Sequence, residues 1–176
     1  TLAAADAILH NKKFGDTYKE WYHLYPDEKY GYGGNFKLWC QGNEEAYSHS
    51  YGNGAIMRIA PVIYANASIY DSVTCSHNHE DSLQAAYTLK SLYLFKDIPT
   101  TSPFKRGFQI NSMDTLHIVM KAVYSSMNLY ELFEYLIELG GDVDTNCSIA
   151  GELFCHLVGK KALNRADVEY VESKLD

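Results

Sequence analysis

Apolar residues recur at helical spacing along nearly the whole chain, and this periodicity limits the fold more than any other feature. The clearest segment is 129–139, where Asn128 provides an N-cap and Gly140 a stop. No run of several residues alternates between apolar and polar side chains as a half-buried strand does. The pattern therefore predicts an all-α fold of roughly eight to ten short helices. A chain of 176 residues has the length of one domain, so we expect residues 1–176 to form a single domain.

Caps, stops and apolar spacing also give the bounds expected for each helix. Pro61 lies inside one of them and should kink the helix or restart it. Asp114 or Thr115 is the expected N-cap of a later helix. The expected helices are 2–11, 16–24, 36–41, 55–64, 80–96, 114–124, 129–139, 146–158 and 167–175.

The charge balance excludes some classes of function. The chain carries 15 basic and 22 acidic side chains, a formal net charge of −7, whereas a nucleic-acid binder needs a basic face. Charged residues interrupt every apolar stretch well before the ~20 residues that a membrane-spanning helix requires. The four cysteines include no C-x-x-C pair and are too few for a disulfide framework. We therefore expect a soluble, cytoplasmic protein with free thiols and no nucleic-acid or membrane partner.

The strongest chemical signal is the segment Gly-Gly-Asp-Val-Asp-Thr-Asn at 140–146, between two expected helices. Asp142, Asp144 and Thr145 would place three hard oxygen donors on one tight turn, which suits Mg²⁺, Mn²⁺ or Ca²⁺. The alternative is structural: the glycines end one helix, and Asp144 or Thr145 is the N-cap of the next. Spacing alone favours the cap.

A second segment, Ser-His-Ser-Tyr-Gly-Asn-Gly-Ala-Ile-Met-Arg at 48–58, is a glycine-bearing loop that leads into a helix. Unpaired amides and the positive end of a helix dipole would meet an anion there, and glycines let the backbone approach a phosphate closely. The alternative is a plain turn in which Asn53 is the N-cap and Arg58 is solvated or paired internally. The chain contains neither a Walker A loop nor a G-x-G-x-x-G fingerprint, so a phosphate site here would be of another kind.

A third segment, 74–81, carries two histidines and a cysteine before an expected helix. The histidines could bind a transition metal, but the H-E-x-x-H pattern is absent. The plainer interpretation makes Asn78 the N-cap of the helix. A cysteine nucleophile, Cys75 or Cys155 beside a histidine, would need a third orienting group that one sequence does not identify.

Taken in order, three segments of the chain resemble the ADP-ribosylglycohydrolase family. They are Ser-Tyr-Gly-Asn-Gly-Ala-Ile-Met-Arg at 50–58, Ser-His at 76–77, and Gly-Gly-Asp-Val-Asp-Thr-Asn at 140–146. The resemblance is specific over about residues 45–155. It implies a compact, orthogonally packed bundle of short helices with a centre of two Mg²⁺ or Mn²⁺ ions. It also implies a hydrolase that removes ADP-ribose from a modified protein side chain or from a small molecule.

The resemblance assigns roles to individual residues. Asp142, Asp144 and Thr145 match metal ligands, and the two carboxylates are the expected catalytic residues. Oxocarbenium-like charge develops when the bond to the anomeric carbon breaks, and two metals would orient the ribose hydroxyls and lower the pKa of a bound water. The residues that match the substrate-binding positions are Ser50, Tyr51, Gly52, Asn53, Gly54 and His77.

The chain departs from the family at its front. Members of the family carry a Gly-Asp segment and a Thr/Ser-Asp-Asp-Thr segment upstream of the helix that here begins near Leu2, and the second of these supplies the other half of the metal centre. Because neither segment is present, we expect an N-terminally truncated domain of a metal-dependent hydrolase. The alternatives are a catalytically silent member that binds ADP-ribose or has a structural role, and an unrelated helical protein.

Overall fold

Helices account for the regular structure of the chain. The computed structural model describes residues 1–26, 31–47, 49–96 and 107–159, together with positions 163, 169 and 173. Within these residues the chain forms ten α-helices and one 3₁₀ helix and has no β-strand, which confirms the predicted all-α fold. None of the helices in these ranges combines the length and the apolar character needed to cross a membrane.

The bounds of the helices are α1 Leu2–Leu9, α2 Phe14–Leu24, α4 Gly34–Cys40, η1 Glu44–Tyr47, α5 Gly54–Met57, α6 Ala60–Tyr64, α7 Ile69–Thr74, α8 Glu80–Phe95, α9 Ser112–Ser125, α10 Leu129–Leu139 and α11 Val143–Val158. Most of the helices have eleven residues or fewer, and α8, α9 and α11 are the longer ones.

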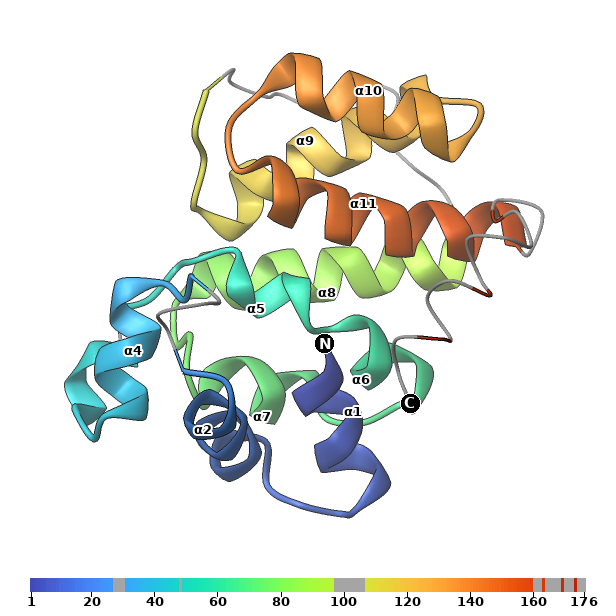
Figure 1. Ribbon diagram of the computed structural model, residues 1–176. Coiled ribbons are helices and arrows are strands. Elements are labelled where there is room, and N and C mark those ends of the chain that lie inside the picture. Colours follow the sequence, from blue (N-terminus) through green and yellow to red (C-terminus); the bar gives the residue numbers. More distant parts are fainter. Residues whose placement is uncertain are drawn as a thin grey trace.

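The long helix α8 crosses the middle of the molecule and separates two groups of helices (Figure 1). Helices α9, α10 and α11 lie on one side of α8, and α1, α2, α6 and α7 lie on the other. Helix α11 contacts α10, α9, α8 and α5, so it joins the upper group to the short helix that follows the glycine loop. The first turn of α11 and the loop before α5 are thereby brought to the same part of the fold.

The core forms where helical spacing places apolar side chains on one face. Leu116, Val119 and Val123 are buried on α9 at positions i, i+3 and i+7. Ile149 and Leu153 are buried on α11 one turn apart. These side chains belong to one continuous cluster, so α9 and α11 share a core with the rest of the domain.

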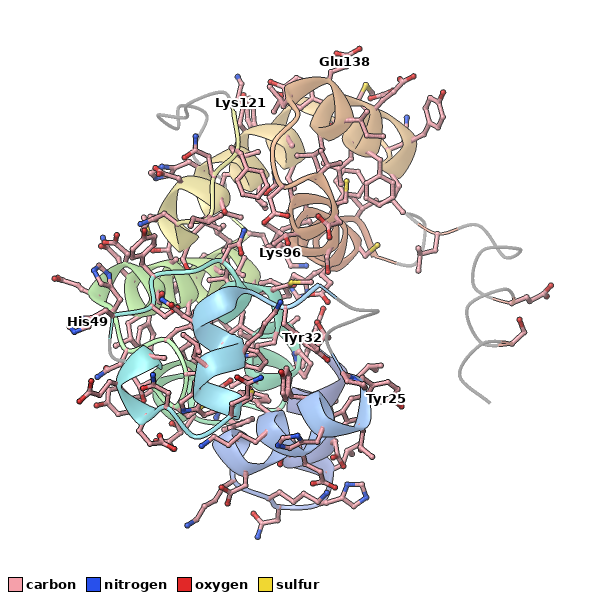
Figure 2. The ribbon with its side chains drawn as sticks, turned by 60° about the vertical axis from the view of Figure 1, so that its left-hand side comes forward. Tyr25, Tyr32, His49, Lys96, Lys121 and Glu138 are labelled. Carbon is pink, nitrogen blue, oxygen red and sulfur yellow. The ribbon has the colours of Figure 1, made fainter. Side chains whose placement is uncertain are left out.

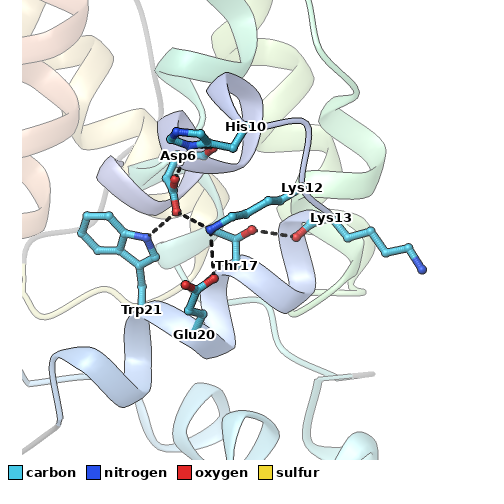
Figure 3. A network of polar contacts seen from close by, with 7 residues as sticks. All are labelled: Asp6, His10, Lys12, Lys13, Thr17, Glu20 and Trp21. Atoms are coloured by element: carbon cyan, nitrogen blue, oxygen red, sulfur yellow. Dashed lines mark hydrogen bonds and ion pairs between the residues drawn. The ribbon is translucent and has the colours of Figure 1, made fainter.

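A polar network joins the first two helices at the edge of the fold (Figure 3). The Asp6 carboxylate accepts hydrogen bonds from Trp21 Nε1 at 2.9 Å and from Lys12 Nζ at 3.4 Å. Lys12 also donates to Glu20 at 3.1 Å. The Trp21 hydrogen bond is the largest cause of the lowered pKa of Asp6. Because the ion pairs are exposed, they orient α1 against α2 more than they stabilise the domain.

Two short helices occupy residues 54–64, where Pro61 was expected to kink the helix or to restart it. Helix α5 ends at Met57 and α6 begins at Ala60, with Pro61 in its first turn, so Pro61 restarts the helix. Helix α7 was not predicted. Ser68 caps it by accepting from the backbone N–H of Asp71 at 3.2 Å, and its six residues are too few to show clear periodicity.

Two predicted N-caps are wrong. Asn111 caps α9, where Asp114 or Thr115 was expected, and its Oδ1 accepts from the N–H of Met113 at 2.7 Å. The residue that caps α8 is His79 and not Asn78, because its Nδ1 accepts from the N–H of Asp81 at 3.1 Å. The expected helix 167–175 lies largely outside the described residues.

Truncation of Leu153 should destabilise the domain, because this side chain is fully buried where α11 meets the core. Leu153→Ala is expected to cost about 2–5 kcal/mol, which lowers the melting temperature by roughly 5–15 °C in a chain of this size. The matched control is Leu9→Ala, since Leu9 is 78% exposed and should change the melting temperature little. Equal melting temperatures for the two variants, measured by circular dichroism, would contradict this assignment of the core.

Candidate functional site

One short hydrogen bond joins two segments that are far apart in the sequence. They are the glycine loop, residues 50–54, and the carboxylate turn, residues 140–145, which leads into α11. Asn53 Nδ2 donates to Asp142 Oδ2 at 2.7 Å across 89 positions of sequence. The same Asn53 nitrogen lies 3.4 Å from the hydroxyl of Thr115, a buried residue of α9. This contact places Asp142 beside the loop, and the single Asn53 amide joins α5, α9 and α11.

Neither partner in this hydrogen bond caps its own helix. Asn53 occupies the N-cap position of α5, and Asp142 occupies that of α11. In both cases the side chain makes no capping hydrogen bond, although Asn and Asp are among the preferred capping residues. Asn53 therefore holds the expected N-cap position without making a capping hydrogen bond, whereas the cap expected at Asp144 or Thr145 is wrong, because both residues lie inside α11. The Asn53 and Asp142 side chains are directed into a tertiary contact instead.

Backbone pairing with the start of α9 holds the glycine loop in place. Gly52 and Asn111 form an isolated antiparallel bridge, in which Asn53 N–H donates to the Ile110 carbonyl at 2.8 Å. The Ser112 hydroxyl donates to the Gly52 carbonyl at 2.7 Å. Within the described residues, the N–H groups of Gly52 and Gly54 have no protein acceptor. These two amides are available to an anion, whereas the dipole of a four-residue α5 contributes less than expected.

Close backbone packing fixes the start of α11. Gly141 has φ +88°, and a Cβ built on it would lie 2.5 Å from the carbonyl oxygen of Gly107. Only glycine fits this position, because a side chain would collide with backbone that has no room to move. The turn before Asp142 is therefore clamped against the segment that leads into α9.

The two carboxylates of the turn influence one another. Burial raises the pKa of Asp142, and the adjacent Asp144 carboxyl adds to that rise. A hydrogen bond from Asp142 lowers the pKa of the exposed Asp144, and backbone N–H groups lower it further. One proton is thus held preferentially by Asp142. Thr145 is buried beside them, with its hydroxyl 3.9 Å from Met57 Sδ.

His77 lies beneath the glycine loop. Its ring is 5% exposed, and its Nε2 lies 3.4 Å and 3.5 Å from where a Cβ on Gly52 or Gly54 would be. Burial, helped by the charge of Arg58, holds the pKa of His77 well below its ordinary value. The imidazole is therefore neutral at pH 7 and faces the loop.

Two further residues of the loop differ in how they could meet a ligand. Tyr51 is 43% exposed, and its ring makes an edge-on contact with His79 at a centroid separation of 5.7 Å. Ser50 is buried, and its carbonyl oxygen lies 3.4 Å from the Ser82 hydroxyl. Tyr51 can offer a ring face to a ligand, whereas Ser50 supports the loop from inside.

The side-chain oxygens of the carboxylate turn are of the kind that binds a hard cation, but there are only a few of them. Asp142, Asp144 and Thr145 supply carboxylate and hydroxyl oxygens, which suit Mg²⁺ or Mn²⁺. The Oδ1 of Asn146, one turn from Asp142, is a buried acceptor without a partner. Within the described part of the chain, no group of three or more His, Cys, Asp or Glu side chains is arranged to hold a metal.

The structure adds one carboxylate that sequence patterns did not single out. Glu152 lies on α11 two turns beyond Asp144, and burial raises its pKa. The Thr1 hydroxyl donates to the Met57 carbonyl at 2.8 Å and to the Glu152 carboxylate at 3.3 Å. Thr1 therefore lies between α5 and α11. The sequence does contain one signal for Glu152. It follows Thr145 by seven positions, so the two residues lie on the same face of α11, two turns apart.

The cysteine residues do not resemble activated nucleophiles. Burial raises the pKa of the thiols of Cys75 and Cys155, whereas a nucleophilic cysteine needs a lowered pKa. Both ring nitrogens of His156 are engaged, with the Tyr64 hydroxyl at 2.9 Å and the Tyr93 carbonyl at 2.8 Å. The cysteine–histidine alternative therefore has no support in this structure.

A surface pocket of about 220 Å³ lies elsewhere, between the end of α9 and α10. Glu131, Glu134 and Glu138 line it together with Ser125, Ser126 and Tyr135. Figure 2 shows Glu138 at one end of the molecule, well away from His49, which directly precedes the loop residues Ser50–Gly54. Three carboxylates would repel a diphosphate, so this pocket does not suit an anionic ligand.

Asp142→Asn should raise the stability of the domain at neutral pH. A raised pKa in the folded state means that the protonated form stabilises the fold, and this contribution is lost as the pH rises through that pKa. The asparagine removes repulsion from Asp144 and keeps an acceptor for Asn53. We expect the melting temperature of Asp142→Asn to be higher than that of the wild type at pH 7, and the difference to shrink toward pH 3.

Asp142→Ala is the control for this substitution, because it removes both the charge and the acceptor for Asn53. It should not raise the melting temperature. A lower melting temperature for Asp142→Asn than for the wild type at pH 7 would show that the carboxylate is a net stabilising group.

Comparison with known proteins supports the fold. No family model matches the sequence, and no curated protein resembles it in sequence. Among solved structures, the chain is similar to an "ADP-ribosylglycohydrolase-related protein complex", with a TM-score of 0.68 and 16% identity. The match covers 93% of this chain and 71% of that chain. Identity this low shows the fold alone, and the chain therefore shares an all-α fold with a protein described as related to ADP-ribosylglycohydrolases.

Proposed function

We propose that this protein is a metal-dependent hydrolase that removes ADP-ribose from a modified protein side chain or from a small molecule. The observation that carries the proposal is the 2.7 Å hydrogen bond between Asn53 and Asp142. It joins the loop that would bind the diphosphate to the carboxylates that would bind metal. A ligand with both a diphosphate and a ribose would need these two features side by side.

The loop offers groups that suit the adenosine diphosphate part of the ligand. The N–H groups of Gly52 and Gly54 have no acceptor among the described residues and can bind phosphate oxygens. The partly exposed ring of Tyr51 gives a surface on which adenine can stack. His77 lies beneath the two glycines and would contact the ligand from below.

The turn offers groups that suit a divalent cation. Asp142, Asp144 and Thr145 would hold one Mg²⁺ or Mn²⁺ ion, with waters completing its coordination. A bound metal would orient the ribose hydroxyls and supply a water of lowered pKa. The described residues contain no group of three or more His, Cys, Asp or Glu side chains that would hold a second ion by itself.

The position of Thr1 suggests where further ligands would come from. Its hydroxyl contacts Met57 and Glu152, and Met57 in turn contacts Thr145. Any residues joined to Thr1 in a longer protein would start beside the carboxylate turn. In a longer protein, such a segment would be placed to supply ligands of a second ion.

A catalytically silent protein that binds ADP-ribose is the second candidate. The observation that favours it is the absence, within the described residues, of a cluster of three or more metal-binding side chains. The glycine loop does not depend on such a cluster, since its amides and Tyr51 would remain available. In both cases the partner is an ADP-ribose conjugate, and a cytoplasmic location remains a prediction.

Calorimetry with ADP-ribose tests the role of the loop. Asn53→Ala removes the donor to Asp142 and the link to Thr115, and it should weaken binding about tenfold, as expected for the loss of a hydrogen bond to a charged group. Asn43→Ala is the matched control, because Asn43 is exposed and caps only its own turn. Equal affinities in Asn53→Ala and the wild type would show that the loop is only a turn.

Release of ADP-ribose from a labelled substrate tests the metal centre. Residues 1–176 alone should be nearly inactive at millimolar Mg²⁺, because Mg²⁺ binds poorly when few protein oxygens replace its waters. A protein extended upstream of Thr1 by its own gene sequence should be active in Mg²⁺ or Mn²⁺, and Asp144→Ala should abolish that activity. Asp16→Ala, at an exposed aspartate in the first turn of α2, should leave it unchanged.

Two results would redirect this interpretation. Strong hydrolysis by residues 1–176 would show that the described ligands suffice without an upstream segment. An inactive extended protein that still binds ADP-ribose would favour the silent candidate.

A further inference from the structure

Arg58 is a buried cation without an acidic partner. It is 7% exposed, and its guanidinium lies over the ring of Tyr18 at 4.2 Å. In the described part of the chain no ion pair joins it to a carboxylate. A buried guanidinium usually has a carboxylate partner, so its neutral partners here call for a functional explanation.

The neutral partners of Arg58 lead to His77. One terminal nitrogen of Arg58 donates to the Ser72 carbonyl at 3.0 Å and to the Ser76 hydroxyl oxygen at 2.5 Å. The Ser76 hydroxyl lies 2.9 Å from Nδ1 of His77. The same arginine nitrogen is 3.5 Å from that Nδ1. A chain of hydrogen bonds therefore runs from Arg58 through Ser76 to the imidazole.

This chain fixes where the proton of the neutral imidazole lies. Arginine only donates, so the Ser76 oxygen accepts from Arg58 and its own proton is free to donate. The Ser76 hydroxyl also interacts with the Cys75 thiol, but sulfur is a weak acceptor, so His77 Nδ1 at 2.9 Å is the stronger acceptor for that proton. A proton on Nδ1 would also point at a second donor, the Arg58 nitrogen. Nδ1 is therefore the acceptor, and the proton is on Nε2.

The protonated nitrogen faces the glycine loop. A Cβ atom placed on Gly52 would lie 3.4 Å from Nε2 of His77, and one placed on Gly54 would lie 3.5 Å from it. A side chain at either position would therefore contact this nitrogen. No hydrogen-bond partner of Nε2 is present in the described residues. The imidazole thus places an unpartnered N–H beside the two unpaired amides of the loop.

We propose that Arg58 and Ser76 are positioning residues that hold the proton of His77 on Nε2, so that His77 donates to the ligand and selects an acceptor such as a phosphate oxygen. This inference rests on the proposed function for the identity of the ligand. The low pKa of His77 supports it, because the ring stays neutral and the choice of tautomer matters. The unpaired charge of Arg58 adds an attraction for an anion.

Long-range ¹H–¹⁵N NMR on ¹⁵N-labelled protein without ligand tests the assignment, because it separates protonated from unprotonated ring nitrogens. The wild type should show His77 protonated on Nε2. Ser76→Ala should shift His77 toward a mixture of tautomers and weaken ADP-ribose binding about tenfold. Ser72→Ala is the matched control, since it removes a buried hydroxyl in α7, four positions before Ser76, that contacts Tyr18 at 2.7 Å and not His77. It should change neither the tautomer nor the affinity.

The outcomes separate this proposal from the proposed function. Protonation of His77 on Nδ1 in the wild type would refute the proposal, and so would an unchanged tautomer in Ser76→Ala. An Nε2-protonated His77 in a wild-type protein that does not bind ADP-ribose would support the assignment of the proton and refute the proposed function. Loss of binding in Ser76→Ala without a change of tautomer would also contradict the proposal.

Discussion

The hydrogen bond between Asn53 and Asp142 is the contact on which the candidate site depends. Each residue stands at a helix N-cap position, and each gives up the local capping bond for a tertiary one. Helix α11 does not need a capping hydrogen bond, because it also contacts α5, α8, α9 and α10. This tertiary packing stabilises the helix without its cap. As a result, the position of the glycine loop and the position of the carboxylate turn are fixed relative to each other.

The charges around this contact are divided between its two sides. Asp142 and Asp144 lie on the α11 side, where their proximity raises the pKa of one and lowers that of the other. Arg58 lies on the α7 side, buried among neutral partners and linked to His77. A cation would suit the first side and an anion the second. This division matches a ligand with a diphosphate at one end and a metal-bound ribose at the other, as the proposed function requires.

Local signals predicted the helices well where caps and periodicity agree. Helix α10 begins after Asn128 and ends before Gly140, as expected. Helix α7 is too short to show a clear apolar periodicity in the sequence. The candidate site was harder, because its main contact joins residues 89 positions apart. Local rules predicted a cap at Asn53 and another at Asp144 or Thr145, and only the tertiary structure shows that the Asn53 and Asp142 side chains bond to each other instead. The resemblance to a family, and not spacing, placed these segments in one site.

The most direct test of the account is an NMR titration of the ¹⁵N-labelled protein with ADP-ribose. We expect saturable shifts of the amides of Gly52 and Gly54 and of the side-chain NH₂ of Asn53, and added Mg²⁺ should shift the signals of Asp144 and Thr145. Saturable shifts confined to the pocket of Glu131, Glu134 and Glu138 would contradict it. So would a loop that does not respond to ADP-ribose at all.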